Sequence, residues 1–372
     1  MDVISFARGV PAPECLAVDE LADCARTALE RDGKRILLYG PGGGYGPLRE
    51  WIAESHGVEP GRVVLTSGSL QGFVFLAEHL VRPGTRVLVE APTYDRPLKI
   101  LSRLGAEIVP LEMDDEGLVP EALERAVGEG SAPAFLYTIA TFQNPSGRTM
   151  SEERRRRVVE IARERNLLVL EDDPYGLVRY EGTAPPLLFD LDRAAGGGGE
   201  HVAYASSFSK TIAPGLRVGY FVLPADLATQ IEALAVSTYI SPPFLTQATI
   251  HEFLRRGTFE PNLARVNGLL KARRDALLEA LERELPEDAT FTRPEGGYFV
   301  WVDVPSGPDT ADLLPRAEAA GVTFVKGADF FVGGREGSQS MRLAFSYVSP
   351  EEITEGISRL APLLRTSAPA SL

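Results

Sequence analysis

One run of the sequence places Lys210 in a turn rich in hydroxyl groups. Ser207 and Ser209 lie beside it, Arg217 follows, and the apolar stretch 201–205 comes directly before. Hydroxyl and guanidinium groups are donors that a phosphate needs, and a partly desolvated lysine can hold a neutral, nucleophilic amine. Strand ends are where α/β folds place ligands. The run therefore predicts a phosphate site beside a carbonyl-reactive amine, although a solvated surface lysine also fits it.

Two more runs carry polar side chains at chain turns. Asn144 lies in the turn 141–147, and Asp172 and Asp173 follow the apolar stretch 167–170, with Tyr175 soon after. Taken separately, each has an ordinary explanation, because Asn-Pro-Ser-Gly is a good turn and Asp-Asp-Pro is a common strand exit.

The order of these motifs along the chain resembles that of fold-type I pyridoxal-phosphate (PLP) aminotransferases. The similarity is greatest to the branch of 2-aminoadipate and kynurenine aminotransferases, which also includes the effector domains of PLP-binding transcription regulators. It extends from Ser5 to Leu343, and the residues that carry it are Asn144, Pro145, Asp172, Tyr175, Ser207, Ser209, Lys210 and Arg217.

This resemblance implies a role for each residue around the cofactor ring. Lys210 would hold PLP as a Schiff base and move the proton between the substrate Cα and the cofactor. Asp172, rather than Asp173, would face the pyridine nitrogen and keep it protonated, so that the ring accepts electrons. Asn144 and Tyr175 would donate hydrogen bonds to the phenolic oxygen and help to set the pKa of the Schiff base. Tyr94 would stack on the ring, although a packed loop tyrosine is the plainer interpretation.

The resemblance also implies a phosphate site and its neighbours. The run 66–72 precedes a helix-like stretch, so its amides can point at an anion, although a simple N-cap also explains its serines. With Ser207, Ser209 and Arg217, the phosphate ligands would be Ser69, Leu70 and Gln71. Tyr39 matches the tyrosine that reaches the phosphate of the neighbouring subunit, which implies a homodimer.

Substrate recognition is implied at both ends of the chain. Arg342 matches the arginine that binds the substrate α-carboxylate through two parallel hydrogen bonds, with Asn144 beside it. Gly9 and Arg8 lie in a segment that resembles the loop that closes over substrate. Many relatives have a small residue in place of Arg8, so Arg8 either binds a distal acidic group or points into solvent.

Alternating apolar and helix-like stretches predict the framework for these residues. Runs that are apolar at every position are typical of strands covered on both faces, as in a mostly parallel α/β sheet. They are 63–65, 86–89, 134–137, 167–170, 201–205 and 218–222. The segment 152–166 is expected to be a crossover helix with Ser151 as its N-cap. The resemblance implies fold type I, in which a large domain with a seven-stranded, mostly parallel sheet is flanked by helices and joined to a smaller α+β domain.

We expect three segments. Residues 1–30 would form an N-terminal part of the small domain and a substrate lid, residues 31–265 the large PLP-binding domain, and residues 266–372 the small C-terminal domain. The change of pattern supports this division, because a long helical region from 246 to 284 is followed by short strand-like pieces and a last helix at 350–364.

Composition excludes several other classes. With 38 Lys plus Arg against 52 Asp plus Glu, the net charge of −14 opposes nucleic-acid binding. No apolar run is long enough for a membrane span, the N-terminus resembles no signal peptide, and two cysteines fit a reducing cytoplasm. The histidines and cysteines lack metal-ligand spacing, so we expect no metal.

The expected function is transamination between an L-amino acid and a 2-oxo acid. The same residues would also support β-elimination, decarboxylation or oxidative deamination. A PLP-binding regulatory domain is disfavoured, because the chain starts almost at the aminotransferase-like region and is acidic. A hydrolase is disfavoured because no Gly-x-Ser-x-Gly motif is present.

Overall fold

The computed structural model describes residues 3–196 and 198–365. Within these residues the largest sheet has eight strands, in the order β2-β9-β8-β7-β6-β3-β4-β5. Five adjacent strands of this sheet are parallel to one another, in the order β8, β7, β6, β3 and β4. Strand β9 is antiparallel to both of its neighbours, β2 and β8. The strands are β2 (Val63–Thr66), β3 (Arg86–Ala91), β4 (Glu107–Asp114), β5 (Gly117–Leu118), β6 (Phe135–Thr138), β7 (Leu168–Asp172), β8 (Val202–Ser207) and β9 (Gly219–Val222). The predicted α/β fold with a mostly parallel sheet is confirmed.

The predicted number of seven strands is wrong by one. The additional strand, β5, is antiparallel to β4 and only two residues long. It returns through Gly117, whose φ of 90° favours glycine. A segment this short has no periodicity that a sequence pattern could reveal.

Alternate residues of the strands face two separate hydrophobic layers. Leu88, Leu136 and Val169 join the layer formed with α2 (Gly46–His56), α5 (Pro120–Gly128), α6 (Glu152–Arg165), α7 (Leu188–Ala194) and α9 (Phe244–Arg255). Val87, Val89 and Leu170 join the layer formed with α3 (Ser69–Leu80), α4 (Asp95–Arg103) and α8 (Ala225–Tyr239). Helices therefore cover both faces, which explains why the central strands β3, β6 and β7 each contain a run of consecutive apolar residues.

The helix predicted at 152–166 is α6, and Ser151 occupies its N-cap position. The Ser151 side chain does not cap the helix, however, because its hydroxyl bonds to Glu116 at 3.1 Å. The helical region predicted from 246 to 284 consists of two helices, α9 and α10 (Phe259–Glu284), interrupted at Gly257 with φ 69°.

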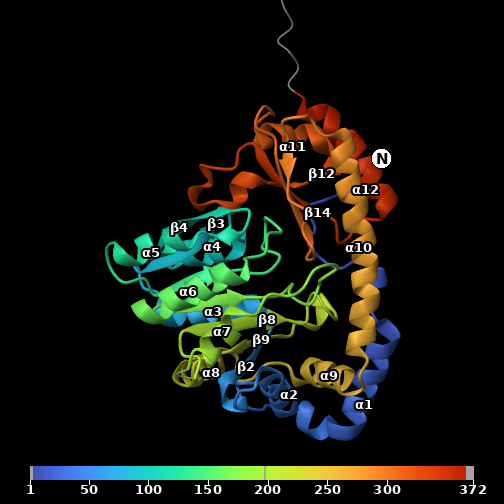
Figure 1. Cartoon of the computed structure of the whole chain (residues 1–372). Helices are drawn as coiled ribbons and strands as arrows, with labels where there is room; N and C mark the ends of the chain where they lie inside the picture. The colour runs from blue at the N-terminus through green and yellow to red at the C-terminus, as the bar shows by residue number, and fades with distance from the viewer. Residues whose placement is uncertain (1–2, 197, 366–372) are drawn as a thin grey trace, which may run out of the picture.

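A second, smaller group of elements lies above the large sheet in Figure 1. An antiparallel four-stranded sheet has the order β10 (Thr290–Phe291), β11 (Phe299–Asp303), β14 (Ser340–Ala344) and β13 (Val325–Lys326). It packs with α11 (Thr310–Ala319) and α12 (Pro350–Leu364) in one core. The N-terminal strand β1 (Ile4–Ser5) joins this core by pairing with β12 (Val322–Thr323).

Two helices connect the upper and lower groups of elements. In Figure 1 the long helix α10 runs beside both groups, and α1 (Val18–Ile36) packs against α9 at the lower end. Each of these helices spans one of the expected domain limits, 30/31 or 265/266. The three-segment division stays a prediction.

Among the described residues, no helix combines the length and the apolar character needed to cross a membrane. Cys15 and Cys24 are both buried and free. The cytoplasmic location stays a prediction.

Candidate active site

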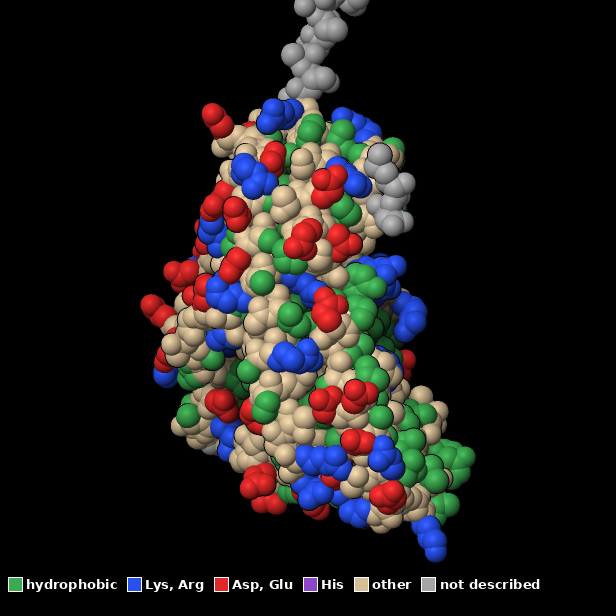
Figure 2. Space-filling view, turned by 90° about the vertical axis from the view of Figure 1, so that its right-hand side faces the viewer, with side chains coloured by type: hydrophobic (Ala, Val, Ile, Leu, Met, Phe, Trp, Pro, Cys, Tyr) green, Lys and Arg blue, Asp and Glu red, His purple; other side chains and the backbone are tan. Residues whose placement is uncertain are grey.

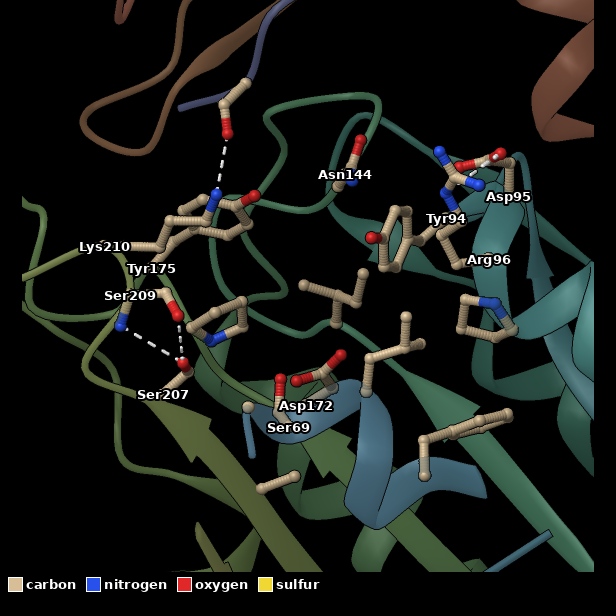
Figure 3. Close-up of a pocket in the computed structure, with 18 of the residues that line it drawn as sticks. Ser69, Tyr94, Asp95, Arg96, Asn144, Asp172, Tyr175, Ser207, Ser209 and Lys210 are labelled. Carbon is tan, nitrogen blue, oxygen red and sulfur yellow. Dashed lines mark hydrogen bonds and ion pairs between the residues drawn. The ribbon is translucent and has the colours of Figure 1, made fainter. Parts of the chain in front are cut away.

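A cavity of about 420 Å³ lies where β6, β7 and β8 end at the carboxyl edge of the large sheet. Figure 3 shows Lys210 and Tyr94 on opposite sides of it, with Asp172 and Ser69 toward its floor. Of the residues predicted from the sequence, those that line the cavity are Gly9, Ser69, Leu70, Tyr94, Asn144, Asp172, Tyr175, Ser207, Ser209, Lys210, Arg217 and Arg342. The topology thus brings residues from both ends of the chain to one place.

The Lys210 amine lies against aromatic rings rather than in solvent. Its Nζ is 5.6 Å from the ring centroid of Tyr175 and 5.2 Å from that of Tyr298. It donates a hydrogen bond to the carbonyl oxygen of Gly9 at 2.7 Å. Burial, with smaller effects of Arg342 and Arg217, lowers the pKa of Lys210 to about 8. The neutral, nucleophilic form of the amine is therefore more populated near neutral pH than it is for a solvent-exposed lysine.

The two neighbouring carboxylates at the end of β7 have different surroundings. Asp172 lines the cavity, and its Oδ1 is buried with no hydrogen-bond partner in the described part of the chain. Asp173 lies outside the lining, and its two oxygens accept bonds from Gly176 N and the Tyr204 hydroxyl. Burial raises the pKa of Asp172 to about 7. A buried acceptor without a partner calls for a donor inside the cavity, such as a protonated ring nitrogen.

Several hydrogen-bond donors lie close together at one corner of the cavity. Ser207 Oγ bonds to Ser209 Oγ at 2.8 Å, and Arg217 Nη1 is 3.5 Å from Ser209 Oγ. The helix α3 begins at Ser69, so its first amides and the positive end of its dipole face the same corner. Gly68 has a φ of 86°, which favours glycine, and the guanidinium of Arg217 lies directly against its Cα. The corner has the donor set of a phosphate site.

Three more residues lie around the space between Lys210 and Asp172. Tyr94 presents its ring to the cavity, and Asn144 and Tyr175 line it from the turn after β6 and the loop after β7. Desolvation keeps the Tyr175 hydroxyl protonated, because it raises the pKa of Tyr175 well above its usual range. Tyr175 is therefore a permanent hydrogen-bond donor.

Arg342 lies on β14 and is buried between the rings of Phe299 and Phe330, at 4.3 and 5.0 Å from their centroids. Its Nη1 donates to Asn144 Oδ1 at 2.9 Å and its Nη2 to Ala7 O at 3.0 Å. Its Nε has no partner among the described residues. Nε of the guanidinium is therefore free to donate a hydrogen bond at the cavity wall. Nη1 and Nη2 could also bind a ligand if they gave up their present acceptors.

Three predicted residues lie outside the cavity lining. Gln71 uses its side-chain oxygen to accept a hydrogen bond from Ser67 N at 2.7 Å. Arg8 is exposed and stacks over Tyr347, with its Cζ 5.3 Å from the ring centroid. Tyr39 is 81% exposed. Their predicted roles stay predictions.

Sequence reasoning did not identify several residues that complete the site. Tyr137 donates to Asp172 Oδ2 at 2.8 Å, and Phe299 and Arg96 line the cavity. In the sequence, the sign that Tyr137 could belong to the site was its hydroxyl group, which ends the apolar, strand-like run 134–137. Within residues 3–196 and 198–365, no cluster of His, Cys, Asp and Glu is arranged to hold a metal ion.

The comparisons with known proteins agree with this geometry. The family model described as aminotransferase class I and II matches residues 2–360. The chain belongs to this family. It is a PLP-dependent aminotransferase, and the cavity fits that cofactor with an anion corner, a reactive amine and a free carboxylate oxygen.

Relatives of this aminotransferase match over nearly their full length. The aromatic-amino-acid aminotransferase 1 of Thermococcus litoralis is 36% identical over 98% of this chain and 88% of its own. The 2-aminoadipate transaminase of Thermus thermophilus is also 36% identical, over 98% of this chain and 90% of its own. A solved alpha-aminoadipate aminotransferase from Thermus thermophilus, complexed with N-(5'-phosphopyridoxyl)-L-leucine, has a TM-score of 0.92 and 36% identity and covers 97% of this chain and 92% of its own.

Proposed function

We propose that this aminotransferase exchanges an amino group between an L-amino acid and a 2-oxo acid with Lys210, Asp172 and Arg342 as its central residues. The observation that carries the proposal is the position of the Lys210 amine in the same cavity as the unpartnered Asp172 oxygen and the anion corner. PLP, when bound, supplies an aldehyde for the amine and a ring that accepts electrons.

Each side chain then has a defined task. Ser207, Ser209 and Arg217 would hold the phosphate, and Asp172 would accept a hydrogen bond from the ring nitrogen and favour its protonated form. Asn144 and Tyr175 would donate hydrogen bonds to the phenolic oxygen. Lys210 would bind the cofactor and then take the proton from the substrate Cα, because the lowered pKa of about 8 favours the neutral amine that acts as a base.

We propose that Arg342 binds the substrate α-carboxylate. Its unpartnered Nε and the neighbouring Nη groups support this role, because a carboxylate accepts parallel bonds from a guanidinium edge. The names of the relatives, which cover aromatic amino acids and 2-aminoadipate, favour an amino donor with a large side chain. Arg96 is exposed at the cavity rim with its Nε 3.8 Å from Asp95 Oδ2, so an acidic side chain would compete with Asp95 for this guanidinium.

The test is a single-turnover screen of L-amino acids that follows conversion of the PLP form to the pyridoxamine form by absorbance. A lysine in place of Arg342 keeps the charge but loses the planar fork, so Arg342→Lys should raise KM for the amino acid about 100-fold and change kcat less. Arg156→Lys serves as the control, because Arg156 is exposed on α6 and lies outside the cavity lining.

Two outcomes would contradict the proposal. Release of ammonia or carbon dioxide in place of the pyridoxamine form would indicate elimination, oxidative deamination or decarboxylation. An unchanged KM in Arg342→Lys would remove Arg342 from the substrate site.

We also propose a homodimer in which Tyr39 reaches the phosphate corner of the partner subunit. The support is an apolar surface at the end of α1 and of α8, where Leu37, Leu38 and Tyr39 are 68%, 70% and 81% exposed and Val236 is 46% exposed. A Cβ on Gly42 would clash with the Val236 side chain, so the segment after Tyr39 packs on α8. Figure 2 shows hydrophobic side chains gathered at the lower right of one face. Such a surface is typical of a protein interface.

The dimer proposal predicts two separable effects. Tyr39→Phe should remain dimeric in analytical ultracentrifugation but bind PLP about tenfold more weakly, because one hydrogen bond to a charged group is lost. Leu38→Asp should separate the subunits and weaken PLP binding as well. A monomeric wild type, or unchanged PLP affinity in Tyr39→Phe, would contradict the proposal.

A further inference from the structure

Tyr137 and Asp172 form a buried pair inside the large sheet. Tyr137 lies on β6 and is fully buried, and its hydroxyl donates to Asp172 Oδ2 at 2.8 Å. Both residues line the active-site cavity. The second carboxylate oxygen, Oδ1, has no partner in the described part of the chain. The two oxygens of Asp172 are therefore in different situations.

The surroundings of Tyr137 fix the direction of this hydrogen bond. The ring of Phe73 meets the Tyr137 ring edge-on at 5.3 Å, and apolar side chains of the same layer enclose it. Burial, with the negative charges of Asp172 and Glu90, raises the pKa of Tyr137 well above its usual range. Tyr137 therefore stays protonated, and it donates while Asp172 accepts.

We propose that Tyr137 is a positioning residue that occupies one oxygen of Asp172, keeps the carboxylate charged and aims the other oxygen at the ring nitrogen of PLP. This inference rests on the proposed placement of the ring nitrogen at Asp172. It extends that placement, because it assigns the orientation and charge of the carboxylate to a tyrosine on the neighbouring strand.

The electrostatic balance at Asp172 explains why such a donor is needed. Desolvation raises the pKa of the carboxyl group, and Asp173 and Glu90 raise it further, whereas the hydrogen bond from Tyr137 lowers it. Without Tyr137, the carboxyl group would be more basic and free to rotate. A proton shared between Asp172 and a pyridine nitrogen would then move toward Asp172, and the ring would accept electrons less well.

The chain contains a matched control on the next strand. Tyr204 on β8 is also buried, and its hydroxyl donates to Asp173 at 3.1 Å. Asp173 lies outside the cavity lining. Tyr204→Phe therefore removes a comparable tyrosine–carboxylate bond that does not reach the active site, and it reports what loss of such a bond does to folding alone.

The test uses holoenzyme loaded with PLP that carries ¹⁵N in the ring, and it reads the ring-nitrogen chemical shift at neutral pH together with the PLP dissociation constant. Tyr137→Phe should move the shift toward the unprotonated value and raise the dissociation constant about tenfold. Tyr204→Phe should match the wild type in both. A fluorotyrosine placed at position 137, which is a stronger donor, should move the shift in the opposite direction and keeps the test available if Tyr137→Phe does not fold.

The results for three variants separate this inference from the proposed function. A wild-type shift and affinity in Tyr137→Phe would overturn it, as would an equal change in Tyr204→Phe. If Asp172→Asn leaves the ring-nitrogen shift unchanged, the placement of the ring nitrogen itself fails. If Asp172→Asn changes the shift and Tyr137→Phe does not, only the role of Tyr137 is refuted.

Discussion

Lys210→Ala is expected to lower kcat for transamination by at least about 10⁴-fold, because the variant loses both the amine that binds PLP and the base that moves the Cα proton. The protein should keep its fold, since the Lys210 side chain makes one hydrogen bond, to Gly9 O, and no ion pair among the described residues. Stopped-flow absorbance after addition of an amino acid measures the rate. Borohydride treatment followed by mass spectrometry should detect a PLP adduct on the wild type only.

The control is an exposed lysine that lies outside the cavity and forms an ion pair with a neighbouring carboxylate. Lys271 bonds to Asp275 on α10, and Lys271→Ala should leave the rate unchanged. In the wild-type apoprotein, capture of PLP should accelerate as the pH rises through about 8, since the neutral amine is the nucleophile and becomes dominant above that pKa. A PLP adduct in Lys210→Ala, at any other lysine, would refute the assignment.

Asp172→Asn is expected to lower kcat by about 10²–10³-fold with a small change in KM. The amide cannot balance a positive charge on the ring nitrogen, and losing one partner of a buried charged pair costs about 3–5 kcal/mol. Steady-state kinetics measure the loss. An exogenous cofactor analogue with a permanent positive charge at the ring nitrogen, N-methyl-PLP, should restore part of the rate.

Asp173→Asn distinguishes the two adjacent carboxylates. Asp173 is bound to Gly176 N and Tyr204, so its replacement should affect stability more than kcat. A larger loss of kcat in Asp173→Asn than in Asp172→Asn would reverse their roles.

The sequence was most informative where the chemistry lies in consecutive residues. Ser207 ends one strand, Ser209 and Lys210 come directly after it, and Asp172 ends the neighbouring strand, so the strand-end rule for parallel sheets was enough to expect them together. The cavity lining includes all four. Arg342 and Gly9 needed the family resemblance, because they come from opposite ends of the chain.

The remaining features of the site and fold could not be predicted, because they depend on how the strands pair and on where individual side chains point. Tyr137 belongs to an apolar run, and only the pairing of β6 with β7, with Tyr137 opposite Leu170, brings its hydroxyl within reach of Asp172. Arg8 lies in a segment without helix or strand, so no periodic pattern in the sequence could predict that its side chain lies over Tyr347. The strand β5 was too short to leave a pattern.

The segment that follows β1 contacts both the Lys210 amine and the Arg342 guanidinium. Ala7 O accepts from Arg342, and Gly9 O accepts from the Lys210 amine. The two carbonyls are separated by one residue, and Val10 O accepts a hydrogen bond from the Ser346 hydroxyl. Amine and guanidinium thus contact one short length of peptide, so a shift of that peptide would alter both contacts.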